Sequence, residues 1–178
     1  QILLFAYPPE SASELGLWLE KRNLTDERLQ VLPQEGSTLG EQMLIAFQMA
    51  KRRGLLPALI IGTDSPTLPQ TIFAEAEEHI AAQQAVIGRA DDGGFYCLGL
   101  SEVREAFFFG ADYSNDTVYE RTFQALSKHY SFVHALPVWV DIDDETSLQA
   151  LLRLHETEIA PSSQTLVLAR KYAMETTA

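Results

Sequence analysis

The chain has 178 residues, which is enough for one domain with a sizeable core. Hydrophobic residues make up 46% of it and charged residues 21%, a balance typical of soluble globular proteins. Asp and Glu outnumber Lys and Arg by 25 to 13, so the formal net charge is −12. A surface of this sign repels phosphate backbones, and we therefore expect no nucleic-acid partner.

The cysteine count and the apolar runs bear on the cellular compartment. Cys97 is the only cysteine, so no disulfide can form within the chain, which fits a reducing cytoplasm. The sequence has no apolar run of the length of a membrane span and no signal-peptide pattern. We therefore expect a cytoplasmic protein without a membrane partner, whose oligomeric state the sequence leaves open.

Strands and helices are predicted to alternate from the start of the chain. The apolar run at residues 2–6 predicts a buried strand, and Ser11–Glu14 has the spacing of a helix capping box. A short strand is predicted over 29–32. Thr38–Glu41 forms a second capping box, which opens a strongly amphipathic helix that stops near Gly54.

The second half continues the alternation. We expect strands over 58–61, 85–87, 95–100 and 132–136, with helices over 69–83 and 116–129 and another capped by Asp143 or Asp144. This order is typical of a three-layer α/β/α sandwich with a mostly parallel sheet. We expect one such α/β domain over residues 1–158, followed by a weakly helical tail over 159–178. In such sheets, ligands bind at the carboxyl ends of the strands.

The turn Gly62-Thr63-Asp64-Ser65-Pro66 follows one of these buried strands. Asp64 is therefore expected at the sheet edge, as an oxygen ligand for Mg²⁺ or Mn²⁺ shared with substrate phosphates. The alternative is that Asp64 caps the turn into the next helix.

A second acidic turn, Asp141-Ile142-Asp143, follows the apolar residues 138–140. In an extended chain, side chains alternate between faces, so these two carboxylates point the same way, as binding of a hard cation requires. The alternative is an acidic first turn that stabilises the positive end of the next helix. Both interpretations hold together if Asp144 is the cap.

The run Asp91-Asp92-Gly93-Gly94 is predicted to be a loop between two short strands. Glycine permits positive φ and lets a ligand approach the backbone closely. The carboxylates of Asp91 and Asp92 could take a proton, bind a sugar hydroxyl or help to hold a cation.

The remaining polar residues give weaker signals. His79, His129, His134 and His155 show no metal-ligand spacing, which favours surface or core roles. Ser114 opens a polar helix start, where capping is the stronger interpretation and binding of a hydroxylated acceptor is the alternative.

The ordered set Gly62–Pro66, Asp92-Gly93-Gly94-Phe95-Tyr96 and Asp141–Asp143 resembles a bacterial family of glycosyltransferase-A-like (GT-A-like) proteins, often called radical-SAM/selenodomain-associated transferase 1. The segment Gln34–Phe47 adds to the resemblance, which covers roughly residues 2–152. It implies a nucleotide-diphospho-sugar transferase fold, of which this sequence begins at the second strand.

The resemblance also implies roles for individual residues. Asp64 would be a catalytic and metal-binding carboxylate, with Asp141 and Asp143 approaching the same Mg²⁺ or Mn²⁺ ion. Asp92-Gly93-Gly94 would line the sugar or acceptor pocket, and we further expect Asp92 to be catalytic, orienting an acceptor hydroxyl or acting as a base. The expected substrate-binding residues are Thr63, Ser65, Asp92, Gly93, Gly94 and Ser114.

The leading hypothesis is therefore a metal-dependent transferase that uses a nucleotide-diphospho-sugar donor and a small-molecule acceptor. Two alternatives remain open. One is a nucleotidyltransferase of the guanylyl- or cytidylyltransferase type, which binds a nucleotide and releases pyrophosphate. The other is a non-catalytic binding or assembly module with a degenerate nucleotide site.

Overall fold

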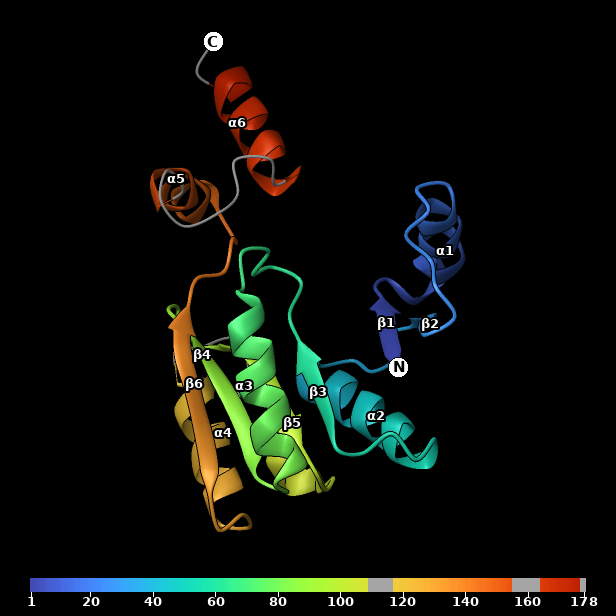
Figure 1. Ribbon diagram of the computed structural model, residues 1–178, viewed down its shortest axis with the longest axis vertical. Helices are drawn as coiled ribbons and strands as arrows, with labels where there is room; N and C mark the ends of the chain where they lie inside the picture. The colour runs from blue at the N-terminus through green and yellow to red at the C-terminus, as the bar shows by residue number, and fades with distance from the viewer. Residues whose placement is uncertain (109–116, 155–163, 177–178) are drawn as a thin grey trace.

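The computed structural model describes residues 1–108, 117–154 and 164–176. Strands and helices alternate through most of this length (Figure 1). The strands are β1 (Ile2–Ala6), β2 (Leu29–Pro33), β3 (Ala58–Ile61), β4 (Ala85–Ala90), β5 (Phe95–Leu100) and β6 (Val133–Trp139). The helices are α1 (Ala12–Glu20), α2 (Leu39–Arg52), α3 (Gln70–Ala81), α4 (Val118–Ser127), α5 (Glu145–Leu154) and α6 (Gln164–Thr176), with short 3₁₀ turns η1 (Pro9–Ser11) and η2 (Glu105–Phe107).

The strands form two sheets. β1 and β2 pair in parallel, and the larger sheet has the order β3-β5-β4-β6. In the larger sheet β3, β4 and β6 run in one direction, while β5 runs against them, because the Asp91–Gly94 turn reverses the chain directly after β4. The expected α/β class is confirmed, with a mixed sheet. Among the described residues, the other edge of β1 carries no strand, and the preceding strand implied by the resemblance stays a prediction.

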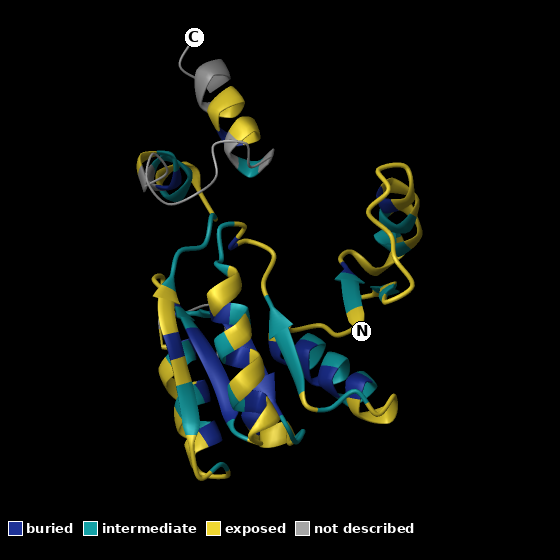
Figure 2. Ribbon diagram, viewed as in Figure 1, coloured by how far each residue is buried: buried dark blue, intermediate teal, exposed yellow. Residues whose placement is uncertain are grey.

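Helices cover both faces of the larger sheet, with α3 in front of it and α4 behind it in Figure 1. Neighbouring residues of β4 point to opposite faces, so Val86 packs toward α3 and Ile87 toward α2 and α4. Figure 2 shows that the buried residues concentrate on the two central strands, β4 and β5. These layers form the three-layer sandwich that the alternation predicts.

The two predicted capping boxes have different outcomes. Thr38 Oγ1 accepts a hydrogen bond from the backbone N–H of Glu41 at 3.2 Å, and α2 begins there as predicted. Ser11 does not cap α1, because its backbone is already helical, with a φ of −76° and a ψ of −7°, and its hydroxyl donates to the carbonyl of Pro8 at 2.7 Å. No helix among the described residues is long and apolar enough to cross a bilayer.

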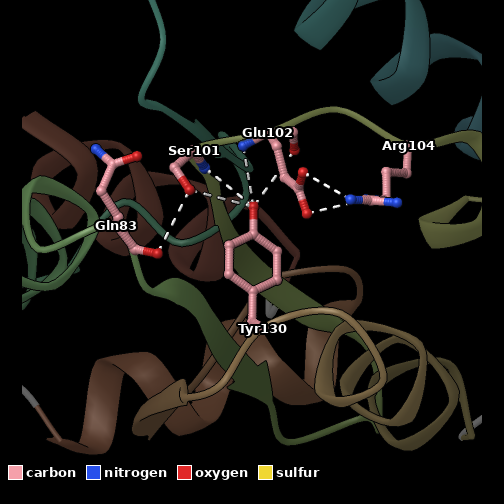
Figure 3. Close-up of polar contacts among 5 residues, drawn as sticks. All are labelled: Gln83, Ser101, Glu102, Arg104 and Tyr130. Atoms are coloured by element: carbon pink, nitrogen blue, oxygen red, sulfur yellow. Dashed lines mark hydrogen bonds and ion pairs between the residues drawn. The ribbon is translucent and has the colours of Figure 1, made fainter.

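A tyrosine fastens the end of β5 to the segment between α4 and β6 (Figure 3). The hydroxyl oxygen of Tyr130 accepts hydrogen bonds from the backbone N–H groups of Ser101 and Glu102, at 3.1 and 3.0 Å. This contact closes the end of the sheet that lies away from the acidic turns.

Replacing Tyr130 with Phe leaves those two N–H groups without their partner. We expect Tyr130→Phe to lower the free energy of unfolding by about 1–2 kcal/mol, because partly buried donors that lose their acceptor keep their desolvation cost. Thermal unfolding measures the loss, with Tyr7→Phe as the control, because Tyr7 is 70% exposed. Equal melting temperatures for the two variants would contradict the role of this hydroxyl.

Cys97 is buried in the face of β5 that α3 covers. Burial raises the pKa of its thiol to about 12. We expect thiol reagents to label the native protein at mildly alkaline pH far more slowly than the urea-unfolded protein, because the thiolate is the reactive form. Equal labelling rates would show that this face of the sheet opens readily.

Candidate functional site

The acidic turns meet at one edge of the larger sheet. β3, β4 and β6 all end at this edge, and each strand leads directly into one of the three turns. The backbone N–H of Ile142 donates to the carbonyl of Asp64 at 2.9 Å. The indole N–H of Trp139 donates to Thr67 Oγ1 at 3.0 Å. These two bonds hold the segment after β6 against the turn after β3.

The turn between β4 and β5 has a fixed backbone. Gly93 has a φ of +96°, which favours glycine, and its N–H donates to the carbonyl of Ala90 at 3.3 Å. The N–H of Gly94 donates to Asp92 Oδ1 at 2.7 Å. The N–H of Tyr119, on α4, donates to the carbonyl of Gly93 at 3.0 Å. The turn therefore holds the Asp92 carboxylate at a defined place on the sheet edge.

Asp92, Asp141 and Asp143 form a cluster in which each residue offers a carboxylate oxygen within 4.8 Å of the others. Burial, and then the charges of Asp92 and Asp143, raise the pKa of Asp141 to about 6. Burial, followed by the charge of Asp64, also raises the pKa of Asp143. The cluster thus concentrates negative charge, which a bound cation would neutralise.

The structure groups the expected metal ligands differently from the sequence. It places Asp141 and Asp143 beside Asp92, which was expected on the acceptor side. Asp64 lies outside this cluster, although its charge reaches Asp143. The sequence does not show this grouping, because the place of Asp92 depends on how the β4–β5 turn meets the end of β6.

An open cleft of about 400 Å³ lies beside Asp64, between the turn after β3 and the two C-terminal helices. A molecule bound in this cleft would contact Asp64 directly. Side chains of Ile142, Leu148 and Leu168 make part of its lining apolar. The full lining comprises Thr63, Asp64, Pro66, Ile142, Leu148, Thr165, Leu168, Ala169 and Tyr172.

The other expected substrate-binding residues occupy varied positions. Thr63 is exposed and lines the cleft, and Gly94 is half-buried. Ser65 is buried, and its hydroxyl has no hydrogen-bond partner among the described residues. Gly93 is buried, so a ligand reaches it only through its neighbours. Ser114 lies outside the described residues.

Asp144 is the residue that caps α5. Its Oδ1 accepts the backbone N–H of Ser147 at 2.7 Å, and hydrogen bonds from Ser147 lower the pKa of the carboxyl. The capping role therefore falls to Asp144, which leaves Asp141 and Asp143 to face the cluster.

Comparison with known families adds to this geometry. Residues 4–115 match a family described as "Uncharacterized protein conserved in bacteria (DUF2064)". The chain belongs to this family. The residues that match the DUF2064 family include Asp64 and Asp92, whereas Asp141 and Asp143 lie beyond the matched region.

A solved structure extends the comparison over nearly the whole DUF2064 chain. The crystal structure of a protein from Desulfovibrio desulfuricans G20, described provisionally as a nucleotide-diphospho-sugar transferase, superimposes with a TM-score of 0.83. The two sequences are 26% identical, and the match covers 97% of this chain and 73% of that one. No curated protein matches the sequence. The nucleotide-diphospho-sugar transferase fold implied by the sequence resemblance is therefore confirmed.

Proposed function

We propose that this protein transfers a glycosyl group from a nucleotide-diphospho-sugar donor, with a divalent cation held by Asp92, Asp141 and Asp143. The observation that carries the proposal is the meeting of these carboxylates at the carboxyl edge of the sheet, where α/β proteins bind ligands. The similarity to the Desulfovibrio protein supports the donor class.

The cluster suits Mg²⁺ or Mn²⁺ by its chemistry. These cations prefer carboxylate oxygens, and the raised pKa of Asp141 reflects negative charge held in a partly buried place. When bound, such a cation stabilises the charge that develops on a diphosphate leaving group. It would also offset the repulsion between a polyanionic donor and a protein of net charge −12.

The proposal gives each acidic residue of the site a separate role. Asp141 and Asp143 would be cation ligands, presented by the segment that Ile142 fastens to Asp64. Asp92, fixed by the N–H of Gly94, would complete the ligand set. Asp64 borders the cleft, so we propose that it acts on the acceptor. Its carboxylate would orient an acceptor hydroxyl in the cleft or take the proton of that hydroxyl. Asp64 and Asp92 thereby exchange the roles that we expected from the sequence.

Product analysis tests the proposal. The protein is incubated with UDP-, GDP- and CDP-sugars in the presence of Mn²⁺ and a mixed panel of hydroxylated acceptors, and the released nucleotides are separated by chromatography. We expect Mn²⁺-dependent release of one nucleoside diphosphate with a matching glycoside.

Two other outcomes would contradict the proposal. In a parallel incubation with nucleoside triphosphates and phosphorylated acceptors, release of pyrophosphate with a nucleotide-linked product would favour a nucleotidyltransferase. Absence of both reactions, together with no binding of any nucleotide, would favour a binding or assembly module.

A further inference from the structure

A second group of metal-ligating side chains lies away from the acidic cluster. Glu75 and His79 project from α3, and His134 projects from β6 beneath it. Residues four apart on a helix share one face, so Glu75 and His79 approach His134 together. The three residues are half-buried, and each offers a ligand atom within 4.8 Å of the others. The sequence favoured surface or core roles for both histidines, because 55 residues separate them.

Hydrogen bonds already hold these side chains in place. His134 Nε2 lies 2.7 Å from Glu75 Oε1, and His79 Nδ1 lies 2.6 Å from Gln84 Oε1. An amide oxygen only accepts, so Nδ1 of His79 donates in this bond, and in the neutral imidazole Nε2 keeps the lone pair that a metal needs. When one ring nitrogen of a histidine ligates a metal, a hydrogen bond from the other ring nitrogen, such as this one to Gln84, orients the imidazole.

The cluster lies at the end of the sheet opposite the acidic turns. His134 is the second residue of β6, whereas Asp141 and Asp143 follow the end of that strand. The five steps along the strand from His134 to Trp139 span roughly 17 Å at the usual rise of a strand. A cation in one cluster is therefore not a ligand of the other.

We propose that Glu75, His79 and His134 bind Zn²⁺ and that the ion fastens α3, from its middle to its last turn, to the start of β6. Two imidazoles and a carboxylate, with solvent in the fourth position, are a zinc ligand set, whereas Mg²⁺ and Mn²⁺ prefer oxygen alone. Ligand atoms on a tetrahedral zinc ion lie roughly 3.3 Å apart, which falls between the 2.7 Å of the His134–Glu75 bond and the 4.8 Å limit of the group.

Binding would change the side chains and leave the backbone in place. The two imidazole rings are stacked, with centroids 3.4 Å apart and planes 13° from parallel. Because an ion lies in the plane of each imidazole that ligates it, the rings must tilt out of this stack. Zn²⁺ would also displace the proton that His134 shares with Glu75.

Titration of the full chain with Co²⁺, a spectroscopic substitute for Zn²⁺, tests the proposal. We expect visible absorption bands of four-coordinate, nitrogen-ligated Co²⁺ that are lost on adding Zn²⁺. His134→Ala should weaken Zn²⁺ binding by about tenfold or more, and Glu75→Gln, which keeps the side-chain shape, should do the same. Zn²⁺ should also raise the melting temperature of the wild type and not of these variants.

Two control variants separate this site from its surroundings. Glu78→Gln removes an exposed charge from the same helix and should bind Zn²⁺ as the wild type does. Asp143→Asn, in the acidic cluster, should leave the Co²⁺ spectrum unchanged. A spectrum that is absent, that shows oxygen ligands only, or that survives in both His134→Ala and Glu75→Gln would overturn the proposal. None of these outcomes affects the proposed transferase activity.

Discussion

Gly88→Ala is expected to lower the free energy of unfolding by about 3 kcal/mol, because the new methyl group has no space. A Cβ atom at Gly88, on β4, would lie 2.3 Å from Cζ of Tyr96. The Tyr96 ring crosses over Gly88 so that its hydroxyl can donate to the carbonyl of Pro137, on β6, at 2.8 Å. Since Tyr96 is buried, its ring can move only by breaking this bond and shifting the end of β6.

Chemical denaturation measures the loss, with Gly16→Ala as the matched control. Gly16 lies within α1, and a Cβ atom there would have nothing within 4 Å. Alanine is the better helix former, so this control should be stabilised by about 0.5–1 kcal/mol. A Gly88→Ala protein as stable as the wild type would mean that Tyr96 does not pack over β4 in this way.

Asp143→Asn is expected to raise stability and to weaken cation binding together. In the metal-free protein the change removes one of three clustered carboxylates and relieves their repulsion. Because the group is largely exposed, the gain should be only about 1 kcal/mol, or roughly 2–4 °C in melting temperature. The same change removes a charged ligand, so Mn²⁺ affinity should fall by about tenfold or more.

Asp144→Asn is the matched control for that change. It removes an equal charge from the adjacent residue but keeps an oxygen that can cap α5 through Ser147. We expect this variant to bind Mn²⁺ much as the wild type does. If both variants lose Mn²⁺ binding equally, the general negative field, and not the Asp92–Asp141–Asp143 cluster, attracts the ion.

Local patterns predicted most of the elements of the fold. The amphipathic spacing of Met43, Leu44, Phe47 and Ala50 identified α2, and all four residues are buried. Strand β6 continues beyond the predicted residue 136 to Trp139, because pairing with β4 extends it past the apolar run. Ser11 failed as a cap because it is already helical at the end of the 3₁₀ turn η1, whereas a capping residue has an extended backbone, and the spacing does not show this turn.

The candidate site was predicted in its residue types but not in its grouping. Spacing along an extended chain placed Asp141 and Asp143 on one side, and the structure has them together. The approach of Asp92 depends on the turn at Gly93 and on the contact with Tyr119, which are long-range features. The Glu75–His79–His134 cluster depends likewise on the packing of α3 over β6.

The central claim is that the acidic cluster holds a cation, which brings the donor to the edge of the sheet. Calorimetric titration with nucleoside diphosphates tests this claim most directly. UDP, GDP and CDP are titrated into the wild type and Asp143→Asn, each with and without Mn²⁺. We predict that one nucleotide binds the wild type about tenfold more tightly with Mn²⁺ and that Asp143→Asn shows no such gain. Equal affinity with and without Mn²⁺ in the wild type would contradict the claim.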